Sequence, residues 1–111
     1  QVGLETSTNR VAGSTAADTS VHVSGILSTG TAYSGRVDGS AETETFPAGS
    51  DDGEWIGDQT GLDHIAIGCL KTSSESRHVD GKIYCIAIWD SDPTGSESDI
   101  EDALNTEYAV Y

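Results

Sequence analysis

The stretch of this chain richest in candidate chemistry is residues 47–60, PAGSDDGEWIGDQT, which combines acidic side chains with turn-forming residues. Carboxylates are hard oxygen donors of the kind that Ca²⁺ prefers. The candidate metal ligands are therefore Asp51, Asp52, Glu54 and Asp58. Their spacing does not match an EF-hand loop, and in so acidic a chain the same acids are also explained as background composition.

Trp55 lies among these acids. A tryptophan in a loop either pins the loop by burying its ring or displays the ring to a partner. A displayed indole is a natural anchor, because aromatic side chains carry much of the binding energy of interfaces. Both interpretations stay open here.

Other residues favour ordinary structural roles over catalysis. Glu42 and Glu44 fall on one face of an extended arm, roughly 7 Å apart, and on a solvated arm such a pair serves solubility. His22, His64 and His78 fall on different expected elements, so they indicate outward-facing histidines rather than a metal site or a nucleophile constellation. We therefore expect no enzymatic activity.

The elements that position these residues are mostly strands. Residues 61–70, GLDHIAIGCL, alternate with period 2, and residues 82–89, KIYCIAIW, are almost wholly apolar, as in a central strand covered on both faces. Ile67 and Ile86 are then core residues. Residues 21–27 also indicate a strand, whereas residues 1–20 suggest a short strand followed by a loop or a weak edge strand.

A hairpin and a helix complete the expected elements. Residues 33–46 are predicted to form a hairpin that turns at Asp38-Gly39, with its acidic side chains on a wet face. Ser96 is a candidate helix N-cap with Asp99 three residues later, and an apolar stripe follows it at helical spacing. The stripe consists of Ile100, Ala103, Leu104, Tyr108 and Tyr111.

The arrangement of these motifs resembles the C-terminal end of laminin-G-like, concanavalin-A-like domains. The segments IAIG (residues 65–68) and VDGKI (residues 79–83) match that family's two consecutive core strands, and the helix matches its closing helix. The resemblance implies an all-β fold, an antiparallel β-sandwich of the jelly-roll type with a short C-terminal helix. We expect one domain, residues 1–111, as a fragment or truncated version of the family domain.

The resemblance also implies ligands for the 47–60 stretch. Many such domains hold Ca²⁺ in rim loops, which makes Asp51, Asp52, Glu54 and Asp58 candidates for a calcium site. Glycan-binding members stack an exposed aromatic side chain on a sugar ring. Here Trp55 would be that side chain, with Asp52 and Asp58 as hydrogen-bond acceptors. The family's hydrolases carry a Glu-x-Asp-x-x-Glu strand that this sequence lacks.

Composition narrows the partners. With 19 acidic and 5 basic residues the formal charge is −14, which disfavours binding to nucleic acid or to anionic lipid. No apolar run approaches the length of a membrane span. The dispersed acids and scarce lysines are similar to proteins of high-salt organisms, although an ordinary acidic protein has the same signature. Cys69 and Cys85 are compatible with one disulfide or with two thiols, and the family pattern favours thiols.

These observations together indicate a non-catalytic structural or adhesive module. We expect it on a virion or extracellular surface, as part of a capsid decoration, spike, fibre or appendage, in contact with copies of itself or with other surface proteins. The alternative is a carbohydrate-binding module of a larger secreted carbohydrate-active enzyme.

Overall fold

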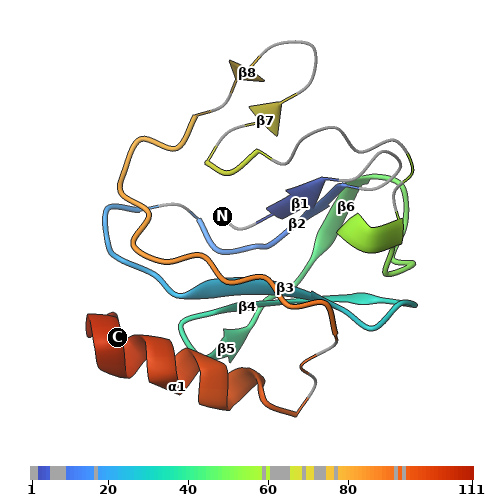
Figure 1. Ribbon diagram of the computed structural model, residues 1–111. Helices are drawn as coiled ribbons and strands as arrows, with labels where there is room; N and C mark the ends of the chain where they lie inside the picture. The colour runs from blue at the N-terminus through green and yellow to red at the C-terminus, as the bar shows by residue number, and fades with distance from the viewer. Residues whose placement is uncertain are drawn as a thin grey trace. The chain divides into compact units, whose positions relative to one another are not determined.

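A computed structural model gives the structure of the chain, and its colouring by residue number can be followed in Figure 1. It describes residues 3–5, 10–16, 18–58, 60, 66–68, 70–71, 75–76, 78–91, 93 and 95–111. The chain divides into two compact units. The first unit is Gln1–Gln59 with Asp90–Tyr111, and the second unit is Thr60–Trp89. The prediction of a single domain over residues 1–111 stays a prediction.

One sheet of the first unit is built from β1 (Gly3–Glu5), β2 (Arg10–Ala12) and β6 (Thr45–Ala48), with β2 in the middle and antiparallel to both neighbours. Val11 and Ala12 of β2 are buried. The sequence indicated only a loop or a weak edge strand here. That interpretation was wrong. Because β2 is short and has one large apolar residue, its place in the middle of the sheet depends on its pairing with β1 and β6 and not on a local sequence signal.

The second sheet of this unit contains β3 (Ser24–Ser28), β4 (Tyr33–Val37) and β5 (Ser40–Ala41), again antiparallel. Along β4 the buried residues alternate with more exposed ones, so one face of the strand supplies core. Asp38 (φ 49°) and Gly39 (φ 77°) connect β4 to β5. Two consecutive positive φ angles are what a type I′ hairpin turn requires, which confirms the predicted turn.

The returning arm of the hairpin differs from expectation. Its ladder ends at Ala41, and the chain then crosses to the other sheet as β6. Glu42, Glu44 and Phe46 are half-buried while the alternate residues are exposed. The predicted wet acidic face is therefore wrong, because both carboxylates accept hydrogen bonds from neighbouring segments.

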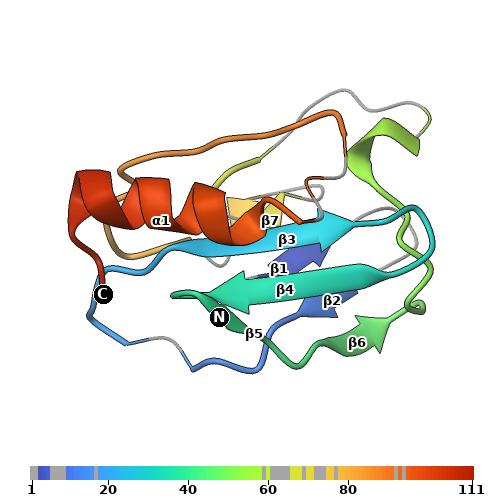
Figure 2. The same ribbon diagram turned by 90° about the horizontal axis from the view of Figure 1, so that it is seen from below.

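The two sheets meet through aromatic side chains. The rings of Tyr33 in β4 and Phe46 in β6 lie with centroids 6.1 Å apart and planes at 36°. Figure 2, seen from below, shows β3 and β4 side by side with α1 running along them. The first unit is thus β-rich, with two antiparallel sheets and one C-terminal helix.

The helix, α1 (Glu97–Tyr108), confirms the predicted short C-terminal helix, but its ends are fixed differently than expected. Ser96 is the N-cap residue and makes no side-chain capping bond, so the predicted capping box is not formed. At the other end the Asn105 side-chain oxygen accepts hydrogen bonds from the backbone N–H groups of Val110 and Tyr111, both at 2.9 Å. These bonds satisfy groups beyond the last turn.

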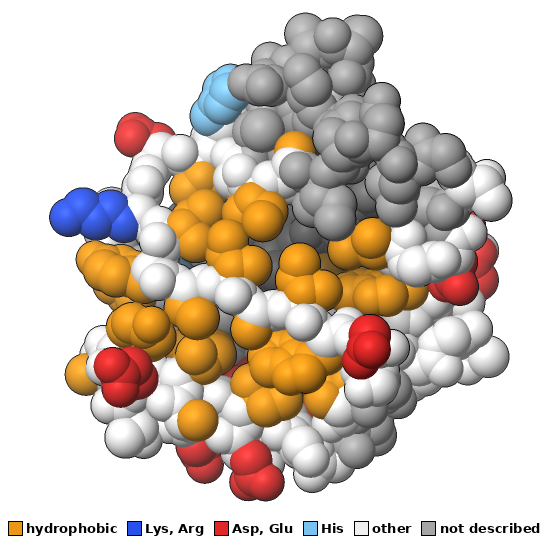
Figure 3. Space-filling view, viewed as in Figure 1, with side chains coloured by type: hydrophobic (Ala, Val, Ile, Leu, Met, Phe, Trp, Pro, Cys, Tyr) orange, Lys and Arg blue, Asp and Glu red, His pale blue; other side chains and the backbone are white. Residues whose placement is uncertain are grey.

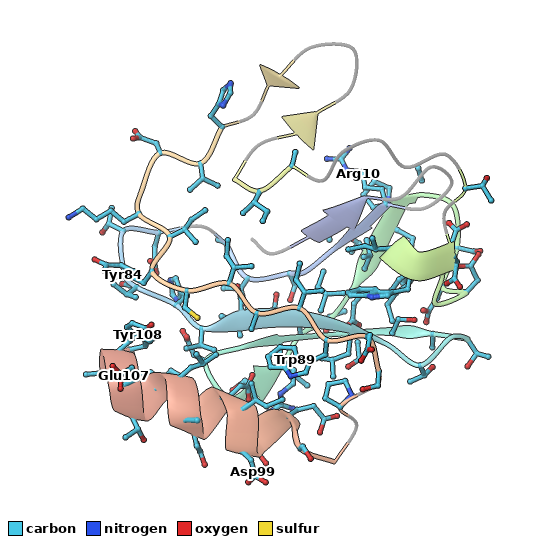
Figure 4. The ribbon with its side chains drawn as sticks, in the orientation of Figure 1. Arg10, Tyr84, Trp89, Asp99, Glu107 and Tyr108 are labelled. Atoms are coloured by element: carbon cyan, nitrogen blue, oxygen red, sulfur yellow. The ribbon has the colours of Figure 1, made fainter. Side chains whose placement is uncertain are left out.

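The side of α1 that is buried carries a charge. Glu101 is 6% exposed and accepts hydrogen bonds from the Arg36 guanidinium at 2.9 and 3.0 Å, which joins the helix to β4. Ile100 and Leu104 of the predicted stripe are half-buried, whereas Tyr108 is exposed. Asp99 and Glu107 project from the helix as exposed side chains (Figure 4).

The second unit has a two-stranded antiparallel ladder, β7 (Leu70–Lys71) with β8 (Glu75–Ser76). Most of the strand predicted at residues 61–70 lies outside the described residues. Residues 82–89 are described, and they form no strand. The prediction of a covered central strand there was wrong. An apolar run becomes core only where neighbours cover it, and Ile67 and Ile86 are both exposed.

Candidate functional site

The loop that carries the predicted ligands is tied to the hairpin of β3 and β4. The backbone N–H of Tyr33 donates to Asp51 Oδ1 at 2.6 Å, and the Tyr33 hydroxyl donates to the carbonyl of Glu54. The Ser28 hydroxyl donates to the carbonyl of Gly53. Asp51 and the backbone beside it therefore hold the loop in place.

Gly53 lies at the closest approach between the loop and the hairpin. It is buried with φ +69°, and a Cβ there would lie 2.5 Å from Thr31 N and 2.6 Å from Ala32 N. Both neighbours are backbone atoms that cannot rotate away. Only glycine fits this position without moving the chain.

The predicted metal ligands do not converge on one point. Asp52 Oδ1 accepts a hydrogen bond from the N–H of Glu54 at 3.1 Å, and Asp58 Oδ2 accepts one from the N–H of Trp55 at 2.7 Å. Within the described residues, no group of three or more His, Cys, Asp or Glu side chains is placed to hold a metal ion. The calcium site stays a prediction that this geometry does not support.

Trp55 is half-buried immediately before the 3-10 turn η1 (Ile56–Asp58). Its backbone N–H donates to Asp58, and the neighbouring N–H of Glu54 donates to Asp52 in the same loop. Of the two interpretations of Trp55, the loop geometry supports partial pinning. A half-buried ring still leaves part of the indole accessible.

Glu42 and Glu44 have structural partners. Both pack over Gly35, where an added Cβ would meet Glu44 Oε1 at 3.2 Å and Glu42 Cβ at 3.3 Å. Glu42 Oε2 accepts a 2.8 Å hydrogen bond from the N–H of Thr15, whose hydroxyl also donates to Glu42. These two hydrogen bonds lower the pKa of Glu42 below its ordinary value, and the bond from the Thr15 hydroxyl has the larger effect.

The three histidines do not form a shared site among the described residues. His22 bonds to Asp18 and Asp38 in the first unit, His78 is exposed in the second unit, and His64 lies outside the described residues. Cys85 is an exposed free cysteine, and Cys69, the other cysteine of the chain, also lies outside the described residues.

The sequence did not reveal that a run of large apolar side chains near residue 85 is exposed. Residues 79–89, called here the apolar segment, carry large hydrophobic side chains between 46% (Trp89) and 59% (Tyr84) exposed. The others are Val79, Ile83, Ile86 and Ile88. Hydrophobic side chains at the surface are visible in Figure 3, and Tyr84 and Trp89 are labelled in Figure 4. The run itself was seen in the sequence, but it was assigned to the core.

The apolar segment is also nearly neutral in charge. Its ionisable side chains at neutral pH are Asp80 and Lys82, which offset one another, so the formal charge of −14 is carried by the rest of the chain. The apolar segment thus has no net formal charge within a strongly acidic protein. Surfaces of this kind mark contact sites more often than free solvent-facing chain.

Among the described residues, no helix is long and apolar enough to span a membrane. Comparison of the chain with protein-family models, with curated protein sequences and with solved structures found no match.

Proposed function

We propose that this chain is a non-catalytic structural or adhesive β-sandwich module that assembles with copies of itself on a virion or extracellular surface. The proposal keeps the laminin-G-like resemblance as the source of the sandwich architecture. The antiparallel sheets and the Tyr33–Phe46 contact between them support that architecture. The acidic, Ser- and Thr-rich composition supports an exposed setting.

The observation that carries the proposal is the exposed apolar segment. Its β-branched and aromatic residues suit an extended strand, and an extended segment can add to a strand of a second molecule through backbone hydrogen bonds. A second copy of this chain is the occupant we favour. Residues 83–89 of each copy carry no charged side chain, so two such stretches can bury hydrophobic area against one another without burying charge.

Charge sets the conditions for this assembly. Two molecules of formal charge −14 repel one another, and salt screens that repulsion over distances of about 10 Å at 0.1 M. We therefore expect self-association to strengthen with KCl. Adaptation to high salt would be the biological counterpart of this dependence.

Light scattering after size exclusion tests the proposal on the full chain over a series of protein and KCl concentrations. We expect species of at least twice the 11.6 kDa chain mass at high salt. Ile86→Glu should abolish these larger species by placing a charge in the apolar segment. Val21→Glu is the matched control, because Val21 is 45% exposed outside the apolar segment and gains the same charge.

A monodisperse monomer in every condition contradicts the proposal, as does equal loss of assembly in both variants. The alternative function, a carbohydrate-binding module, is favoured by the accessible part of Trp55, whose backbone N–H donates to Asp58. Polysaccharide pull-down with wild type and Trp55→Ala separates the two. Sugar retention that is lost in Trp55→Ala, without self-assembly, would support the alternative.

A further inference from the structure

His22 is held between two carboxylates from different parts of the first unit. Its Nδ1 lies 2.6 Å from Asp38 Oδ2, and its Nε2 lies 2.9 Å from Asp18 Oδ1. The remaining carboxylate oxygen of Asp38 accepts a hydrogen bond from the N–H of Val23 at 2.9 Å, and the Asp38 N–H donates to the Val23 carbonyl at 2.9 Å. His22 thus lies where the chain enters β3 and meets the Asp38-Gly39 turn.

Both ring nitrogens can donate only when the imidazole is protonated. A neutral ring has one N–H and one lone pair, so one of the two carboxylates would then face a lone pair. The protonated ring can donate to both carboxylates. When the ring loses its proton, Asp18 and Asp38 remain as like charges near one another with no positive charge between them.

The turn that His22 reaches is connected to the end of the chain. The Arg36 guanidinium donates to the Gly39 carbonyl at 2.9 Å and also binds Glu101 of α1. An added Cβ at Gly39 would lie 3.2 Å from the Tyr111 hydroxyl, so that side chain lies next to the turn. Among the residues that the structure describes, the charged and titratable groups around His22 and this turn are therefore Asp18, Asp38, Arg36, Glu101 and Tyr111.

We propose that Asp18, His22 and Asp38 form a proton-operated clasp that fixes residues 18–23 to the Asp38-Gly39 turn and opens when His22 loses its proton. The direction follows from linkage. Hydrogen bonding to Asp38 and then to Asp18 raises the pKa of His22 above its ordinary value of 6.5. The clasp is complete below that value and opens as the pH rises through the elevated pKa of the folded protein.

Nuclear magnetic resonance of the full chain tests the clasp, with the His22 ring resonances and the backbone amides followed between pH 5 and 9. We expect a His22 midpoint above 6.5. The hydrogen-exchange protection factor of the Val23 amide should fall about fivefold across that midpoint. Amides inside the β3–β4 ladder should show no such step, because the opening is local.

Two variants separate the clasp from general stability. His22→Gln keeps a side-chain donor without a proton to lose, so the step at Val23 should disappear. Asp18→Asn leaves the turn intact and should lower the His22 midpoint. A midpoint at or below 6.5 would overturn the proposal. So would a midpoint that Asp18→Asn leaves unchanged, or a Val23 step that persists in His22→Gln.

Discussion

β4 and the apolar segment both carry large apolar side chains, but these side chains have very different surroundings. In β4, Tyr33 is 5% exposed and packs near Phe46, and neighbours on both sides complete a ladder. In the apolar segment, every large hydrophobic side chain is at least 46% exposed. The difference shows that the burial of an apolar side chain depends on which other segments lie near it in space.

The largest expected effect lies in the core of the first unit. Tyr33→Ala should lower the free energy of unfolding by about 3–5 kcal/mol, because it empties a buried site and removes the hydroxyl bond to Glu54. Ile86→Ala in the monomer should cost less than about 0.5 kcal/mol, as substitutions at exposed positions do. Denaturant titration at low protein and salt concentration measures both, and comparable losses would erase the distinction between the two regions.

A comparison of Gly53 with Gly30 tests how tightly the segment around Gly53 is bound to the hairpin. Gly53→Ala should cost about 2–4 kcal/mol, because it adds a backbone clash to an unfavourable positive φ. Gly30 also has a positive φ (+82°) but has nothing within 4 Å of an added Cβ. Gly30→Ala should therefore cost only about 1–2 kcal/mol. If thermal unfolding gave equal losses for the two variants, the loop would not be tied as described.

The ion pair between α1 and β4 should have a smaller effect. Arg36→Met keeps much of the side chain's apolar bulk but leaves the buried Glu101 carboxylate without its cation, for a loss of about 2 kcal/mol. Glu107→Gln on the exposed side of the same helix is the control and should cost less than about 0.5 kcal/mol. Chemical denaturation of both variants decides whether the pair joins the helix to the sheet.

The smallest predicted effect depends on pH. Glu42 has a depressed pKa, so its contribution is present above the ordinary value of 4.5 and is lost as the pH falls through the folded pKa. Thr15→Val removes the hydroxyl donor and should cost about 0.5–1 kcal/mol at neutral pH, since the site is partly screened by solvent. The difference from wild type should shrink toward pH 3. A difference that stays constant would mean that Thr15 acts through packing instead.

Elements defined by local signals could be predicted from the sequence. The Asp38-Gly39 turn needs two adjacent residues that tolerate positive φ, and α1 follows from its helical spacing and acidic first turn. Features that join distant residues could not. Glu101 looks like a solvated acid until Arg36, 65 residues earlier, is placed beside it.

The candidate site shows the same limit. That Trp55 lies in a connecting segment was predictable from the turn-forming residues around it, although Pro47 and Ala48 of the predicted loop belong to β6 and Ile56–Asp58 form η1. The use of Asp51 and Gly53 to fasten that loop to Tyr33 and Ser28 depends on tertiary contacts. The apolar segment was visible as a hydrophobic run, but its exposure depends on which other segments cover it.

Hydrogen exchange measured on the backbone of wild-type protein tests the central contrast most directly. In dilute, low-salt monomer, we predict slow exchange for β4, which is paired in a ladder, and faster exchange for residues 83–89, which form no strand and are exposed. At high protein and KCl concentration, residues 83–89 should become protected as copies associate. Exchange at residues 83–89 as slow as that of β4 in the dilute monomer would contradict the account.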